Sequence, residues 1–180
     1  INNINQENNL SEKNLEVIRK SIMDLEENEI VEIRGAIVSI PEKNPIYDSC
    51  PNCFKKVILK DETGVCKKCG NISEPIPRML WSLTLDDGTD NIRVTVINKV
   101  AEDLLGMTAI EAKQMIENEL IEHYPLMSKK KELEGKEIII TGSIRYSSFS
   151  SKLELIANNI SYPNPRDELS RLLIRMETYT

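Results

Sequence analysis

The chain has 180 residues, of which 40% are hydrophobic and only 4% aromatic, so it can form one or two domains whose core must be mainly aliphatic. No run of eighteen apolar residues is present, and the first residues lack the basic and apolar regions of a signal peptide, which argues for an intracellular protein without a membrane partner. The net charge of −6 argues by itself against a nucleic-acid partner.

The charges are unevenly distributed along the chain. Residues 1–30 carry three basic against seven acidic side chains, whereas residues 128–153 carry six basic against three acidic ones. Such an asymmetry can leave one face attractive to polyanions, while a mixed, solvated surface is the plainer alternative.

The first half of the chain is predicted to contain a helical or linker segment followed by strands. Residues 1–28 are predicted to be an acidic helical or linker segment, and residues 29–40 a strand that bends at Gly35. Residues 78–98 alternate apolar and polar side chains on both sides of the turn DDGTD, which predicts a hairpin with one buried face. Trp81 shares the parity of the apolar set and is expected to pack inside.

The later elements combine helices and a second strand pair. Residues 99–122 carry a broad apolar stripe, with a capping-box pattern at Thr108 that predicts a break near Gly106. Residues 136–146 and 151–162 are predicted to form strands around the turn SSFS. The final segment is predicted to be an amphipathic helix with Leu169, Leu172, Leu173 and Met176 on one face.

The four cysteines of the chain lie close together as two Cys-x-x-Cys pairs with twelve residues between them. Intracellular thiols stay reduced, and paired knuckles of this spacing are the usual frame of a tetrahedral thiolate site. The pattern predicts one structural Zn²⁺ bound by Cys50, Cys53, Cys66 and Cys69, with all positions filled by protein. Iron in a rubredoxin-like site and a redox dithiol are the alternatives.

The order of elements predicts a fold. Five strands with a helix between the third and fourth are typical of an OB-fold barrel. The predicted domain covers residues 29–162, with a zinc ribbon over residues 46–77 inserted between strands 1 and 2, followed by a C-terminal helix over residues 163–180. The fold class is therefore mainly β.

Several stretches resemble a known family. The ribbon YDSCPNCFKKVILKDETGVCKKCG, the following DDGTDNIRV and AEDLLGM, and the segment GSIRYSSFSSKLELIANNI are similar to archaeal replication protein A. The likeness is strongest to the zinc-bearing C-terminal DNA-binding domain of the eukaryotic large subunit, and it runs from about residue 29 to 180. The resemblance implies a non-enzymatic protein that binds single-stranded DNA in replication, repair and recombination, in an archaeal-like cytoplasm or nucleoid.

The resemblance also implies a binding face on strands 2 and 3. Positions that are typically aromatic in the family are Arg93 and Ile97 here, and Arg93 can still stack on bases and contact phosphate. Tyr146 falls where the family has a stacking aromatic. The remaining candidates surround the turn of the second strand pair: Phe149 for stacking, and Arg145 and Lys152 for phosphate.

Other residues and functions remain as alternatives. Lys129, Lys130 and Lys131 are interpreted as a solvated loop before strand 4, with phosphate contact as the alternative. His123 is assigned no role. In the resembled family, helices at the position of the terminal helix assemble subunits, so this helix either covers the barrel end or packs on another subunit or a second copy. A protein-assembly module and an RNA-binding OB domain therefore compete with single-stranded DNA binding. No Walker loop, GxGxxG or acid–histidine constellation supports catalysis.

Overall fold

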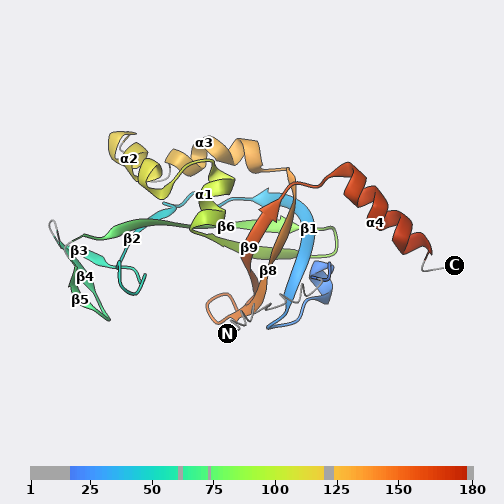
Figure 1. Ribbon diagram of the computed structural model, residues 1–180, viewed down its shortest axis with the longest axis horizontal. Coiled ribbons are helices and arrows are strands. Elements are labelled where there is room, and N and C mark those ends of the chain that lie inside the picture. The colour runs from blue at the N-terminus through green and yellow to red at the C-terminus, as the bar shows by residue number, and fades with distance from the viewer. Residues whose placement is uncertain (1–16, 61–62, 73, 120–123, 178–180) are drawn as a thin grey trace, which may run out of the picture.

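The computed structural model describes residues 17–60, 63–72, 74–119 and 124–177, and it is mainly β, as predicted (Figure 1). Five long strands are joined by hydrogen bonds in a circle, because β6 pairs with β1 as well as with β7. We call them the strand ring; in pairing order they are β1 (Ile30–Ser39), β8 (Glu137–Ser147), β9 (Lys152–Ser161), β7 (Asn91–Ile97) and β6 (Ile76–Asp86).

The strand ring encloses an aliphatic core, as the composition predicts. Alternate side chains of each strand point inward, which is the period-2 pattern of a half-buried strand. Trp81 lies inside, as expected, with 3% of its surface exposed. The fully buried side chains include Ile33, Leu83, Ile140 and Ile144.

Two glycines allow backbones of the ring to approach closely. A Cβ added at Gly35 would lie 2.6 Å from the carbonyl oxygen of Asp86 in β6, and one added at Gly142 would lie 2.3 Å from that of Ile156 in β9. Gly142 also borders an irregularity in the β8–β9 register. The glycine in β1 therefore stands where β1 closely approaches β6, and the irregularity in the β1–β6 register lies further along β1, between Ile37 and Ser39.

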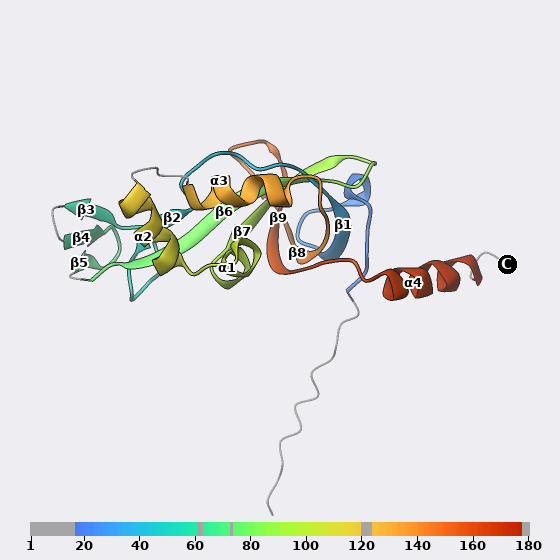
Figure 2. The ribbon, with the colours of Figure 1, turned by 90° about the horizontal axis from the view of Figure 1, so that it is seen from above.

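Three helices lie together on one side of the ring (Figures 1 and 2). They are α1 (Lys99–Leu105), α2 (Ala109–Glu119) and α3 (Tyr124–Leu133). The break after α1 is confirmed, since Gly106 has φ +79° and the Thr108 N–H donates to Glu111 Oε2 at 2.8 Å while the Glu111 N–H donates to Thr108 Oγ1 at 3.2 Å.

The interpretation of residues 129–131 as a loop is wrong, because they lie in α3. Leu126 and Leu133 are 1% and 0% exposed and pack against the core. They are seven positions apart, which places them on the same face of the helix. In the sequence, the three consecutive lysines between these leucines obscure the helical spacing.

The predicted cysteine ribbon leaves the ring at the left of Figure 1. Strand β2 (Ile46–Ser49) pairs with the first part of β6. A small sheet of β3 (Ile58–Lys60), β4 (Thr63–Cys66) and β5 (Gly70–Ile72) follows before the chain enters β6. The pairing of β3 with β4 is antiparallel, and residues 61–62 between them lie outside the described residues.

The C-terminal helix α4 (Pro165–Glu177) projects away from the ring (Figures 1 and 2). Its first turn is held by Glu168, which accepts hydrogen bonds from Arg19 at 2.7 Å and Arg34 at 2.7 Å. Arg19 belongs to the segment before β1, which also contains the short 3-10 helix η1 (Ile22–Asp24). The terminal helix therefore does not cover the ring.

Candidate metal centre and nucleic-acid interface

The four cysteines converge at the ribbon. Their sulfur atoms all lie within 4.8 Å of one another, and the sulfurs of Cys53 and Cys66 are 3.5 Å apart. Cys50 and Cys66 are buried, whereas Cys69 is exposed. The fold thus brings together all four predicted ligands, from two turns that are separated in sequence by a hairpin.

The chemistry of this cluster fits a tetrahedral metal ion. Sulfurs at about 2.3 Å from Zn²⁺ would lie about 3.8 Å apart, close to the separation seen here. Backbone N–H groups of Cys69 and Lys68 lower the pKa of the Cys66 thiol to about 7, whereas the neighbouring thiol of Cys53 raises the pKa of Cys69 to about 12. Four thiolates in so small a space would repel one another, and a cation among them would relieve that repulsion.

The outer face of β6 and β7 consists of the side chains that point away from the ring core. Arg93 and Ile97 lie on it, as predicted, and they stand opposite Thr84 and Leu80 in the strand pairing. The Arg93 side chain is 47% exposed and donates to Ser82 Oγ at 3.3 Å. Ile97 and Leu80 together give this face an apolar part in place of aromatic rings.

A carboxylate lies between two arginines of this surface. Glu154 pairs in register with Arg93 in β7 on one side and with Arg145 in β8 on the other. Its Oε1 is 3.7 Å from Arg93 Nη1, so part of the positive charge of Arg93 is neutralised within the domain. Sequence reasoning missed Glu154, because only the pairing of β9 with β7 brings it beside Arg93.

The turn between β8 and β9 gathers the other predicted contacts. Arg145, Tyr146 and Lys152 are exposed, and Phe149 at the tip is 93% exposed. Two aromatic and two cationic side chains are thus exposed beside the end of β7 that contains Arg93. We call the outer face and this turn the candidate binding face.

The lysines of α3 do not belong to this face. Lys129 pairs with Glu132 at 2.7 Å and Lys130 with Glu42 at 3.0 Å, on the side of the ring that carries the helices. His123 lies outside the described residues. Among the predicted cationic groups, those of β7 and the β8–β9 turn are therefore the ones the fold brings together.

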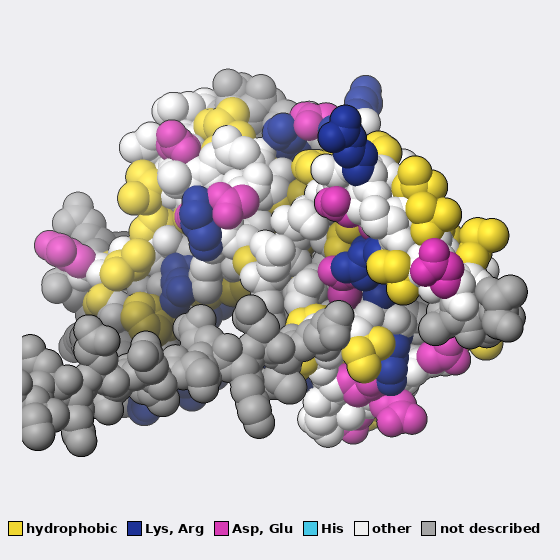
Figure 3. Space-filling view, turned by 45° about the vertical axis from the view of Figure 1, so that its right-hand side comes forward, with side chains coloured by type: hydrophobic (Ala, Val, Ile, Leu, Met, Phe, Trp, Pro, Cys, Tyr) yellow, Lys and Arg dark blue, Asp and Glu magenta, His cyan; other side chains and the backbone are white. Residues whose placement is uncertain are grey.

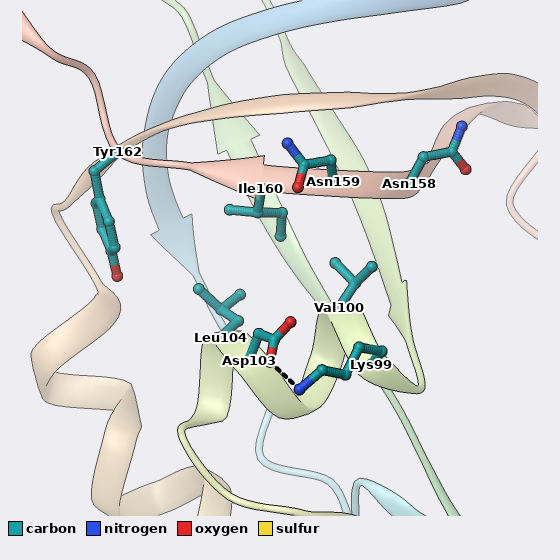
Figure 4. Close-up of a pocket in the computed structure, with 8 residues that line it drawn as sticks. All are labelled: Lys99, Val100, Asp103, Leu104, Asn158, Asn159, Ile160 and Tyr162. Atoms are coloured by element: carbon teal, nitrogen blue, oxygen red, sulfur yellow. Dashed lines mark hydrogen bonds and ion pairs between the residues drawn. The ribbon is translucent and has the colours of Figure 1, made fainter.

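A further hollow of about 340 Å³ lies between α1 and β9 (Figure 4). Lys99 and Asp103 at its edge pair with each other at 2.5 Å, and Val100, Leu104 and Ile160 supply apolar atoms. The close-up shows no convergent set of acids, bases or nucleophiles among its lining residues. No helix among the described residues combines the length and the apolar character needed to cross a bilayer.

The ring and its inserted cysteine ribbon place the chain among mainly β domains of the OB class. A family model described as Replication factor-A C terminal domain matches residues 30–157. The chain belongs to this family, which confirms the resemblance to replication protein A predicted from the sequence.

Two relatives illustrate the extent of the match. The replication protein A 70 kDa DNA-binding subunit of Tetrahymena thermophila is 31% identical over 101 residues, which cover 53% of this chain and 15% of that protein. Replication factor A of Methanothermobacter thermautotrophicus is 25% identical over 143 residues, covering 78% of this chain and 18% of that protein. The chain thus spans less than a fifth of the length of these relatives.

Solved structures agree on the fold. A structure of yeast RPA bound to ssDNA superimposes with a TM-score of 0.70 at 21% identity, covering 91% of this chain and 98% of the yeast chain. A replication protein A heterotrimer bound to ssDNA gives the same TM-score at 18% identity and covers 91% of this chain and 40% of that one. At these identities the comparison establishes a shared fold.

Proposed function

We propose that this domain binds single-stranded DNA with little sequence specificity, as part of a replication protein A. The observation that carries the proposal is the fold shared over 91% of the chain with yeast RPA bound to ssDNA. The exposed rings and cations of the candidate binding face suit unpaired nucleotides, since bases stack on Tyr146 and Phe149 while Arg145 and Lys152 meet phosphates.

The other predicted contacts fit the same role. Arg93 would stack on a base or pair with a phosphate, and Ile97 would offer only apolar contact. Such contacts read the backbone and the faces of bases rather than their edges, so binding would be strongly salt-dependent and nearly independent of sequence. A binding role of this kind involves no catalysis and would serve repair and recombination as well as replication, inside the cell.

In this proposal the ring is a closed five-stranded OB barrel, and the ribbon is its first loop. Cys50, Cys53, Cys66 and Cys69 would hold a structural Zn²⁺ that orders this loop beside the binding face. Iron would accept the same four thiolates, and elemental analysis of the pure protein separates the two metals.

A second role, in subunit assembly, is supported by α4. Its side chains Leu169, Leu172, Leu173, Ile174 and Met176 are 52% to 70% exposed, and hydrophobic side chains gather over this helix at the right of Figure 3. An exposed amphipathic helix that is anchored at one end is suited to pack on another chain. We therefore propose that α4 binds other replication protein A subunits, with self-association as the alternative occupant.

Titration of a fluorescent oligo-dT at low and high salt tests the main proposal. Tight binding that weakens with salt and is lost on chelation is the expected result, and matched RNA should compete less well. A folded, metal-loaded chain that binds neither oligomer would leave the assembly role of α4 as the better account.

A further inference from the structure

The two cysteine pairs end in the same backbone shape but with different residues. Gly70 follows Cys69 with φ +83°, and Phe54 follows Cys53 with φ +60°. The Phe54 N–H donates to the carbonyl oxygen of Cys50 at 2.8 Å, which closes this turn. Left-handed backbone is free of strain for glycine but costly for a bulky residue, so the turn alone would favour glycine at position 54.

Packing does not account for the phenylalanine either. The buried cluster of the ribbon consists of Cys50, Val57, Cys66 and Ile72, and Phe54 lies outside it with 56% of its surface exposed. One face of its ring is covered by the guanidinium of Arg78, whose Cζ is 4.5 Å from the ring centroid. A strained and exposed aromatic ring needs another reason, and recognition of a ligand is the usual one.

Arg78 is held in place under this ring. Its Nε donates to Asn98 Oδ1 at 2.8 Å, and Asn98 itself has φ +52°. Among the residues that the structure describes, Arg78 forms no ion pair, in contrast to Arg93 with its partner Glu154. The charge of Arg78 is therefore available to an anion.

The pair lies in line with the candidate binding face. Arg78 belongs to the outer row of β6 that continues through Leu80 and Ser82 to Thr84, which is paired with Arg93. In Figure 1 the turn after β2 and the β8–β9 turn both lie on the side of β6 that faces away from the helices. Six residues of strand span about 20 Å, or about six stacked nucleotides.

We propose that Phe54, backed by Arg78, is a stacking platform for one base of single-stranded DNA at the ribbon end of the candidate binding face. The base covers the free side of the ring, and the guanidinium meets a neighbouring phosphate. The platform supplies the aromatic surface that β7 lacks at Arg93 and Ile97. This inference rests on the proposed binding of single-stranded DNA. It adds that the bound strand extends toward the ribbon.

Phe54→Gly separates this role from a structural one. The variant relieves the backbone strain and removes the ring, so it should retain its metal content and its melting temperature or raise the latter. Its affinity for oligo-dT of about fifteen nucleotides should fall about tenfold, as expected for loss of one stacked base. Leu59→Ala, at a ribbon side chain that is 50% exposed, is the matched control and should bind normally.

Phe54→Trp provides a direct readout of stacking. The wild type has one tryptophan, the buried Trp81, so the variant adds a single exposed indole whose fluorescence oligo-dT should quench. Normal affinity of Phe54→Gly, a loss of its metal, or an unquenched indole would each overturn the platform. If the wild type itself binds no oligo-dT, the proposed function fails instead, so the two failures are distinguishable.

Discussion

The strand ring and the ribbon are stabilised in different ways. The ring encloses a large cluster of buried aliphatic side chains, among them Ile33, Leu83 and Ile140. The hydrophobic cluster in the described part of the ribbon contains only Val57 and Ile72 beside two of its cysteines. A ribbon with so few apolar contacts cannot offset the entropy of ordering its chain, whereas the ring can. The ring therefore depends on its core, whereas the ribbon, in the proposed account, depends on a metal ion held by its four cysteines.

Removal of the metal gives the largest expected effect and tests this contrast directly. Binding of Zn²⁺ to four thiolates is worth about 10–16 kcal/mol in apparent terms, so a strong chelator or Cys66→Ser should unfold the ribbon. NMR spectra should lose the dispersed ribbon signals and keep those of the ring. Collapse of the ring signals at the same time would mean that the two regions form one cooperative unit.

A cavity in the core of the strand ring should destabilise the ring and leave the ribbon unaffected. Ile140→Ala, at a side chain that is 0% exposed, should lower the free energy of unfolding of the ring by about 2–5 kcal/mol. Metal affinity should stay unchanged, because the cysteines pack in a separate small cluster with Val57 and Ile72. Val38→Ala, at an exposed position of β1, is the control and should change the denaturant midpoint little. A weaker metal site in Ile140→Ala would contradict the separation of the two regions.

The close approach of β1 and β6 at Gly35 can be tested by substitution. An added Cβ at Gly35 meets the Asp86 carbonyl oxygen at 2.6 Å, so Gly35→Ala should destabilise the ring by about 1–3 kcal/mol in denaturant unfolding. Gly135→Ala is the control, because its φ is +83° but a Cβ there meets nothing within 4 Å. It should cost only about 1 kcal/mol, and equal losses in both variants would argue against a close approach at Gly35.

The first turn of α4 is anchored through charged side chains. The hydrogen bond from Arg19 lowers the pKa of the Glu168 carboxyl, with Arg34 adding to the effect. A carboxyl with a depressed pKa contributes stability that is full above its unfolded value of about 4.3 and is lost as the pH falls through the folded value.

Glu168→Gln should therefore loosen α4 at pH 7 by about 1 kcal/mol, which is measurable as faster hydrogen exchange in its first turns. The difference from the wild type should vanish in acid below the depressed pKa. Asp167→Asn, at the exposed neighbouring carboxylate, is the control. A difference that persists at low pH would show that Glu168 acts through packing rather than through its charge.

The smallest expected effect concerns DNA binding by the ring itself. Glu154→Gln removes the carboxylate 3.7 Å from Arg93 and should raise affinity for oligo-dT about two- to fivefold, with a steeper dependence on salt. Glu137→Gln is the matched control, since Glu137 pairs with Arg34 away from the binding face. Equal gains in both variants would reflect net charge rather than the state of Arg93.

The sequence allowed prediction of the elements whose signals are local. The hairpin of β6 and β7 follows from alternation, the break before α2 from the capping box at Thr108, and the cluster of four cysteines from the two Cys-x-x-Cys pairs. Helix α3 was missed because its two anchoring leucines flank a lysine run that is typical of a loop. Arg93 was placed correctly on the outer face, since parity along a strand fixes the side to which each residue points.

What the sequence determined by itself was thus most of the order of the elements, the four cysteines that could hold a metal ion, and the resemblance to replication protein A. The tertiary structure decided which distant residues meet: Glu154 beside Arg93, Glu168 between Arg19 and Arg34, and Arg78 against the ring of Phe54. The physical reason is that periodicity and spacing act over a few neighbouring residues, whereas these contacts join segments far apart in the chain, which only the closing of the ring and the docking of the ribbon bring together.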